Sequence, residues 1–209
     1  MRSVLRTAVF VAGALLLSRP AAGQVQVQVQ GLGGRTDAAE HAPFFAGVVG
    51  IKISFIEIDL EAGRLNNVLP SSFLDQIYRL EQQHGLPLRA IVHVPAPYGA
   101  GSVRFIVPSG VFQPFFSAGL GFARLQPQFD VAISGINISD VLGGRIIEPQ
   151  TSTIAILGGG IRLDFHAVNV EGGYRYYAIF SHFERAIDLT STRAISTVQA
   201  IYGALAFRF

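Results

Sequence analysis

Hydrophobic and polar residues alternate along most of the chain. In "FIEIDLEAG" (55–63), Ile56, Ile58 and Leu60 share one parity and the acidic residues between them share the other. The same alternation runs through "SVRFIV", "LGGGIRLDF", "VNVEGGYRYYAIF" and the closing "AIYGALAFRF". A period of two is the signal of a β-strand. The pattern predicts eight strands near 24–34, 43–51, 55–65, 88–107, 112–125, 151–165, 168–180 and 197–209.

The connections between these strands alternate in length. Short ones follow the second, fourth and sixth strands, and longer ones follow the third, fifth and seventh, as in an outer-membrane barrel. The turn near 52–54 has no Gly, Pro or Asn, and a continuous strand there would break the count of eight.

One segment has a helical pattern. In "SSFLDQIYRLEQQHG", Ser72 precedes Asp75 in a capping arrangement, apolar residues recur at helical spacing, and Gly85 follows as a C-terminal cap. We expect a short helix over 72–84 in the loop after the third strand. It would serve as a lid on the barrel mouth or as a partner-binding helix.

The first residues have the three parts of a secretory signal. Arg2 and Arg6 give a basic start, an apolar run follows over 7–17, and "AAG" ends at Gly23. We expect a signal peptide over 1–23 and one β-barrel domain over 24–209. Loss of the three arginines in the signal would change the net charge from +2 to about −1. The basic balance therefore gives no argument for nucleic acid as a partner.

The composition suits a membrane protein that crosses with strands. Half of the residues are hydrophobic and 14% are charged, against about 25% charged in ordinary soluble domains. A long charge-free stretch, 105–123, contains Pro108, Gly110 and Pro114, which argue against one spanning helix. The chain has no cysteine.

Alternation alone does not decide which face points inward. A secreted lipocalin-like barrel hides its apolar face, whereas a membrane barrel turns it toward lipid. The polar face here carries matched opposite charges, Lys52 is the only lysine beside fifteen arginines, and aromatic residues gather near strand ends. These features favour a membrane barrel with an interior charge network. Its expected members are Glu57, Asp59, Glu61, Arg104, Arg162, Asp164, Glu171, Arg175 and Arg208.

Three stretches carry a family resemblance: "QPFFSAGLGFARL" (113–125), "GGGIRLDFHAVNVEGGYRY" (158–176) and "GALAFRF" at the end. They resemble the small eight-stranded bacterial outer-membrane β-barrels of the outer-membrane protein A, X and W superfamily. The resemblance implies a location in the bacterial outer membrane, contact with outer-membrane lipid, and recognition by the barrel-assembly machinery. In that family the terminal Phe and its alternating apolar neighbours are the assembly signal, which here implies Leu205, Phe207 and Phe209.

The function classes remain open at this stage. A plugged, charge-paired interior favours a structural or surface-interaction protein that is monomeric and could bind an extracellular ligand through its loops. A narrow channel for small or hydrophobic solutes is the alternative. A lipid-modifying enzyme has less support, because its one tight cluster, Ser181, His182 and Glu184, does not repeat the family's His-x-Ser pattern. We expect no catalytic residue, metal or cofactor.

Overall fold

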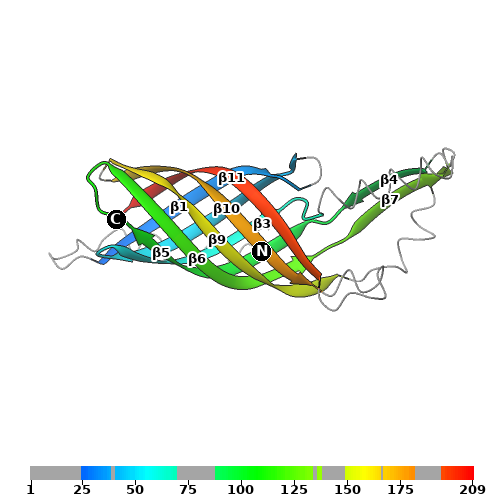
Figure 1. The fold of residues 1–209 in the computed structure, drawn as a ribbon, viewed down its shortest axis with the longest axis horizontal. Coiled ribbons are helices and arrows are strands. Elements are labelled where there is room, and N and C mark those ends of the chain that lie inside the picture. Colours follow the sequence, from blue (N-terminus) through cyan, green and yellow to red (C-terminus); the bar gives the residue numbers. More distant parts are fainter. Residues whose placement is uncertain are drawn as a thin grey trace, which may run out of the picture.

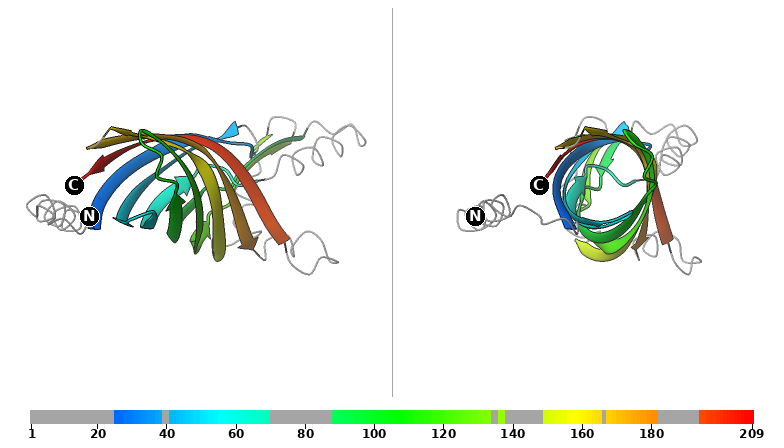
Figure 2. Two further views of the ribbon diagram at one scale, coloured as in Figure 1. Left: turned by 60° about the vertical axis from the view of Figure 1, so that its left-hand side comes forward. Right: turned by 90° about the vertical axis from the view of Figure 1, so that its left-hand side faces the viewer.

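In the computed structural model, the described residues are 25–38, 41–69, 88–133, 136–137, 149–165, 167–181 and 194–209. Eight antiparallel strands among them close into a barrel (Figure 1). The strands are β1 (Val25–Thr36), β2 (Pro43–Ile53), β3 (Ile56–Leu65), β5 (Ala96–Ile106), β6 (Phe112–Leu125), β9 (Gln150–Phe165), β10 (Val168–Ser181) and β11 (Ala194–Arg208). Each pairs with the next barrel strand along the chain, and β1 pairs with β11 to complete the ring (Figure 2). The expected fold class, an all-β eight-stranded antiparallel barrel, is confirmed.

The outer wall of the barrel is apolar. On β3, Ile58 and Leu60 are exposed, whereas Glu57 and Asp59 are buried in the interior. Exposed large hydrophobic residues occur in the same way on all eight strands. A closed ring also satisfies its backbone hydrogen bonds internally, which a structure in hydrocarbon must do. The chain is therefore a transmembrane barrel, with its apolar face toward lipid.

The connections at one end of the barrel are short. Ile53 pairs with Ile56 across a two-residue turn, in which Ser54 has a φ of 60°. The chain thus reverses near 52–54 although no Gly, Pro or Asn is present, because Ser54 adopts the left-handed conformation that such hairpins need. The β5–β6 and β9–β10 connections lie at the same end, as expected, and Gly110 in the former has a φ of 75°.

The expected strand over 88–107 is wrong as one element. It is two strands, β4 (Leu88–His93) and β5, and the chain also breaks between β6 and β7 (Gln128–Ile133). β4, β7 and the short β8 (Ile136–Asn137) form a separate three-stranded sheet, which extends beyond the barrel on the long-loop side (Figure 1). Pro95 and Pro127 stand at the two breaks, where they remove backbone donors, and the Gln126 N–H donates to Pro95 O at 3.0 Å.

The C-terminus is tied into the barrel seam. The Phe209 N–H donates to Val27 O at 2.9 Å, and the Val27 N–H donates to Phe209 O at 3.3 Å. Phe209 lies at the short-turn end with its ring on the outer face. A terminal aromatic residue is thus held on the lipid-facing side of the last strand.

Two expectations fall on residues that the structure does not describe. The signal peptide over 1–23 and the helix over 72–84 both lie outside the described ranges. Within those ranges, no helix is both long enough and apolar enough to cross a membrane.

Candidate functional site in the barrel interior

Two ion pairs on facing walls form the centre of the interior. Glu57 on β3 lies beside Arg104 on β5, and Arg162 on β9 lies beside Glu171 on β10, each pair in direct cross-strand register. Each arginine also reaches the acid on the other wall: Arg162 Nη1 is 2.9 Å from Glu57 Oε2, and Arg104 Nη1 is 2.9 Å from Glu171 Oε1. The contacts within each wall are 3.2 Å for Glu57–Arg104 and 2.6 Å for Arg162–Glu171. We call these four residues the central quartet.

Amide side chains add hydrogen bonds to the two acids of the central quartet. From β1, Gln28 Nε2 donates to Glu57 Oε1 at 2.5 Å and Gln30 Nε2 donates to Glu171 Oε2 at 2.7 Å. The guanidinium of Arg104 also lies 4.9 Å from the centre of the Phe115 ring. All four charged residues are almost completely buried. Buried charges are tolerated when they are paired and hydrogen-bonded in this way.

Asp59 makes fewer contacts than the neighbouring acids Glu57 and Glu171. Its Oδ2 lies 3.1 Å from Arg104 Nη2, and neither carboxylate oxygen has a hydrogen-bond partner among the described residues. With Glu57 and Glu171 it makes three carboxylates around two arginines. Lys52, which pairs in register with Glu57 and is partly buried on the inward face of β2, supplies a further positive charge nearby.

A second pair lies closer to the long-loop end. Arg175 Nη1 lies 2.5 Å from Glu61 Oε1 and 2.7 Å from Oε2, and the Tyr98 hydroxyl donates to Glu61 Oε1 at 2.5 Å. The Arg175 guanidinium stacks on the Tyr202 ring at 4.8 Å. Because β3 and β10 lie on opposite sides of the ring, this pair also spans the lumen.

A third pair lies near the short turns. Arg208 Nη2 is 2.8 Å from Asp164 Oδ2 and donates to Asn169 Oδ1 at 3.2 Å. Gln113 Nε2 donates to the same Asp164 oxygen at 3.2 Å. The nine residues expected in the interior network thus all face inward, in three ion-paired layers.

The interior is apolar at the long-loop end, which the alternation does not indicate. There Tyr177 packs edge-on against Phe44 and Tyr98, at ring separations of 6.0 and 5.9 Å. Other side chains of this layer are fully or almost fully buried: Leu65, Ile154, Ile156, Ile179 and Val198. On β3 at this height Leu65 is buried inside the barrel and Arg64 is exposed outside it, so polarity no longer marks the inward face.

A short segment after β3 closes this end. We call Asn67–Leu69 the strap. The Val68 N–H donates to Val94 O at 3.1 Å, and Ser196 Oγ on β11 donates to Val68 O at 2.8 Å. Asn67 Oδ1 accepts from the Leu69 and Val94 backbone N–H groups, each at 3.2 Å. The strap is buried and joins the β3–β5 side of the mouth to β11 on the far side.

The charged side chains of the network are held in place by their ion pairs and hydrogen bonds. The Glu57 and Glu171 carboxylates accept several hydrogen bonds each, so their lone pairs are largely occupied. Among the described residues, no group of three or more His, Cys, Asp or Glu could hold a metal ion. The arrangement joins opposite walls of the barrel across the lumen.

Sequence reasoning missed several inward residues: Gln28, Gln30, Lys52, Tyr98, Gln113 and Asn169. The strict alternation of "QVQVQVQ" could have found the two glutamines, because their parity opposite the valines places them on the inward face. The tyrosine and the strap carry no such signal.

Comparison with known proteins identifies the fold. No protein-family model and no curated protein matches the chain. Neisserial surface protein A is 15% identical, with a TM-score of 0.50 over 91% of this chain and 100% of that one. The N-terminal β-barrel domain of Pseudomonas aeruginosa OprF is 15% identical, with a TM-score of 0.50 over 89% and 100%. The chain has the fold of the small outer-membrane β-barrels.

The outer membrane enzyme PagL also matches this outer-membrane-type barrel, at 10% identity and a TM-score of 0.41 over 86% of this chain and 98% of that one. The likeness to the first two structures, at 15% identity and a TM-score of 0.50, shows the fold, and function resides in the residues placed on it. The residues implied as the assembly signal, Leu205, Phe207 and Phe209, all lie exposed on the outer face. Of the cluster considered for lipid modification, His182 and Glu184 lie outside the described residues.

Proposed function

We propose that the protein is a monomeric integral barrel of the bacterial outer membrane with a sealed interior and a structural or surface-interaction role. The observation that carries this proposal is the central quartet, whose ion pairs join β3 and β5 to β9 and β10 across the lumen. An eight-stranded barrel has an interior just wide enough for side chains to fill. Arginines that cross this width leave no room for a wide water column beside them.

The other layers support the same conclusion. The Glu61–Arg175 pair crosses the lumen above the quartet, and an apolar layer with the strap follows at the long-loop end. An ion that crossed the barrel would have to separate paired charges and then pass through apolar side chains. Both steps are costly in a medium of low dielectric constant.

The second sheet supports a surface role. β4, β7 and β8 lie beyond the barrel on the long-loop side, which is the extracellular side in barrels of this type (Figure 1). Among the described strands β4 pairs only with β7, so its other edge pairs with no described strand. Such an edge can accept an extended segment of a partner through main-chain hydrogen bonds.

Single-channel conductance in planar bilayers tests the sealed interior. We expect no steady conductance from the mature protein, while an open porin in the same bilayers conducts. A steady conductance that scales with the amount of inserted protein would contradict the proposal and favour the narrow channel.

A further inference from the structure

One buried acid of the interior has no hydrogen-bond donor for its carboxylate oxygens. Asp59 is fully buried, and its ion pair with Arg104, at 3.1 Å, does not have hydrogen-bond geometry. The Gln28 amide has a similar deficit, because its Nε2 donates to Glu57 Oε1 whereas its Oε1 accepts no hydrogen bond from a described residue. Three buried acceptor atoms of this layer, two on Asp59 and one on Gln28, are therefore without a donor among the described residues. Buried polar atoms are usually hydrogen-bonded, so a donor is missing here.

Asp59 and Gln28 meet above a glycine. Gln28 on β1, Gly50 on β2 and Asp59 on β3 are in direct cross-strand register. A Cβ at Gly50 would collide with Asp59 Oδ1, and it would stand 3.2 Å from Gln28 Cγ and 3.4 Å from Gln28 Nε2. Both side chains therefore lean into the space that is left by the absent side chain of Gly50. The acidic oxygen and the amide group share one small, buried volume.

The charges of this layer do not balance if Asp59 is ionised. Its carboxyl groups belong to Glu57, Asp59 and Glu171, and its positive charges are the guanidinium groups of Arg104 and Arg162. The two glutamates each contact both arginines, so these four charges compensate one another without Asp59. An unneutralised buried charge is costly, and a carboxyl group in such a place avoids the cost by keeping its proton.

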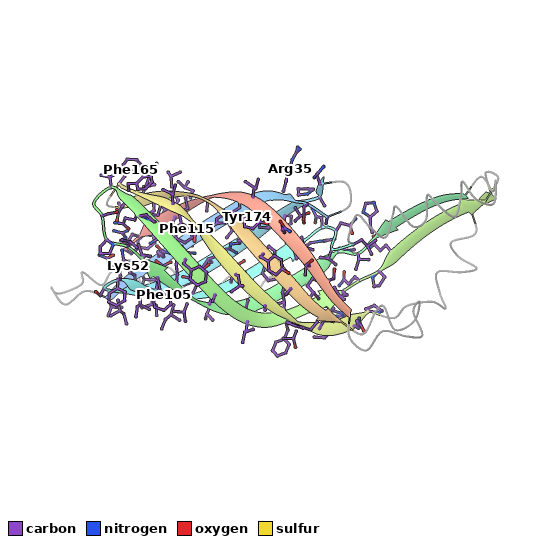
Figure 3. All side chains as sticks on the ribbon, in the orientation of Figure 1. Arg35, Lys52, Phe105, Phe115, Phe165 and Tyr174 are labelled. Atoms are coloured by element: carbon purple, nitrogen blue, oxygen red, sulfur yellow. The ribbon has the colours of Figure 1, made fainter. Side chains whose placement is uncertain are left out.

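A further inward cation, Lys52, lies two residues along β2 from Gly50. It is partly exposed, and it forms no ion pair with a described residue. Figure 3 shows Lys52 near the short-turn end of the barrel, the end that also carries Phe105 and Phe165. Water at this mouth solvates the ammonium group, so Lys52 does not have to neutralise Asp59.

We propose that Asp59 is a proton-binding site, whose carboxyl group stays neutral inside the folded barrel at neutral pH. The proton stands on Oδ1 and is donated to Gln28 Oε1, while Oδ2 keeps its contact with Arg104. One proton thus supplies the donor that both acceptors lack, and it leaves two glutamates matched with two arginines. The Gln28 amide then bridges two acids, as a donor to Glu57 and an acceptor from Asp59. This inference goes beyond the sealed interior, and its test does not depend on conductance.

Infrared difference spectroscopy of the folded full-length mature protein in detergent tests the protonation directly. A neutral carboxylic acid has a C=O stretching band that a carboxylate lacks. The wild-type spectrum minus that of Asp59→Asn, at neutral pH, should contain one such band. Glu61→Gln is the control, because Glu61 is a buried acid on the same face of β3 that is paired with Arg175. Its difference spectrum should contain no acid band. Absence of the band for Asp59, or an equal band for Glu61, would overturn the proposal.

Variants of the glutamines test the hydrogen-bond acceptor. Gln28→Met should shift the Asp59 band to higher frequency, because the acid loses its acceptor. Gln30→Met removes the same kind of bond, from an amide to Glu171, and should leave the band in place. A band that is unmoved in the Gln28 variant would contradict the assignment. A band that appears only in Lys52→Gln would show that the lysine neutralises Asp59 instead. Heat-modifiable mobility confirms folding of every variant.

Unfolding in urea at several pH values gives an independent measurement. The charged groups that face Asp59 are those of Lys52 on β2, Glu57 and Glu61 on β3, Arg104 on β5, Arg162 on β9 and Glu171 on β10. Asp59→Asn keeps all of these, so the ratio of the wild-type and variant unfolding constants isolates Asp59. Unfolding releases the bound proton once the pH exceeds about 4, where an aspartate of the unfolded chain ionises. The ratio should therefore rise about ten-fold per pH unit while folded Asp59 keeps its proton.

A ratio that stays constant between about pH 5 and pH 7 would contradict a bound proton. A bound metal ion is the other source of a positive charge at Asp59. Exchange of sodium for N-methylglucamine at constant ionic strength should leave the wild-type stability unchanged. Stabilisation by sodium that is lost in Asp59→Asn would place a cation there in the proton's stead and overturn the proposal.

Discussion

At the scale of single residues, the interior side chains differ in how many ion-pair and hydrogen-bond contacts they make. Arg162 binds Glu57 through two nitrogens at 2.9 and 3.1 Å and binds Glu171 through Nε at 2.6 Å. Asp59, in the same layer, has a single ion-pair contact at 3.1 Å. Two buried charges of the same layer should therefore respond in opposite ways to removal, because one is fully paired and the other is in excess.

Arg162→Met should destabilise the folded protein by about 3–5 kcal/mol, since it leaves two buried carboxylates short of a partner. The measurement is the free energy of unfolding by urea in detergent or lipid vesicles. Arg35→Met, at an outward arginine with no ion pair to the described residues, should change stability by no more than about 0.5 kcal/mol. Similar small effects at both positions would mean that water reaches the quartet and replaces the lost contacts.

Asp59→Asn should leave stability unchanged or raise it by about 1 kcal/mol. The change removes one of three carboxylates around two arginines, while Arg104 keeps its contacts with Glu57 and Glu171. The same unfolding measurement applies, with Glu57→Gln as the matched control that should destabilise. If Asp59→Asn lowers the free energy of unfolding as much as Glu57→Gln does, Asp59 stabilises the network as much as Glu57. The number of contacts would then not predict the effect of removing a charge.

At the scale of strands, the C-terminal end closes the barrel seam through its backbone, and a role of its Phe209 ring in assembly can be tested separately. Phe209 is hydrogen-bonded to Val27 through its backbone, and its ring is exposed on the outer wall beside the implied assembly residues Leu205 and Phe207. The backbone contacts close the seam between β1 and β11, whereas the ring contributes little to packing within the barrel. A role of the ring in assembly would therefore show in cells more than in purified protein.

Deletion of Phe209 should lower the amount of heat-modifiable, folded protein in the outer membrane by several-fold. Refolding of the purified variant in detergent should be much less affected, because only the end of the seam is lost. Phe165→Ala is the control, since Phe165 is an exposed aromatic residue at the same end of the barrel. Normal yield in cells, or an equal loss in the Phe165 variant, would argue against an assembly signal at the terminus.

Strands were predictable from the sequence where the residues of one face differed in polarity from those of the other. β3 alternates strictly from Ile56 to Glu61, so its acids were assigned to the inward face correctly. The division between β4 and β5 was missed because "LRAIVH" continues the apolar character of the strand, and Pro95 alone does not show that Pro127 interrupts the neighbouring strand at the same height. Partners across the lumen depend on barrel closure, which no local pattern contains.

At the scale of the whole molecule, the strap and the apolar layer lie at the long-loop mouth of the barrel. Asn67 holds the strap in place by accepting two backbone hydrogen bonds, from Leu69 and Val94. Two buried N–H groups lose their partner if this side chain is removed, and each such loss has a cost of about 1–3 kcal/mol.

Asn67→Ala should therefore speed hydrogen exchange at the Leu69 and Val94 amides and lower the free energy of unfolding. Asn169→Ala makes the same change near the short turns, where Asn169 Oδ1 accepts from Arg208. It should destabilise the barrel without selective exchange at the mouth. Unchanged protection of Leu69 in the Asn67 variant would show that other contacts hold the strap.

The ion pairs across the lumen also have a consequence for the order of folding. Glu57 and Arg162 are 105 residues apart in sequence, and Glu61 and Arg175 are 114 apart. The hydrogen-bonded Gln30 and Glu171, on either side of β11, are 141 apart. Contacts of such long range form late, because the chain entropy of closing the loop must be overcome first. Until the two halves of the chain meet, Glu61 and Arg175 have no partner, and the Glu57–Arg104 and Arg162–Glu171 pairs lack their contacts with the opposite wall, so these charges must stay hydrated. Dehydration of the lumen and closure of the β1–β11 seam are thus coupled into one late, cooperative step.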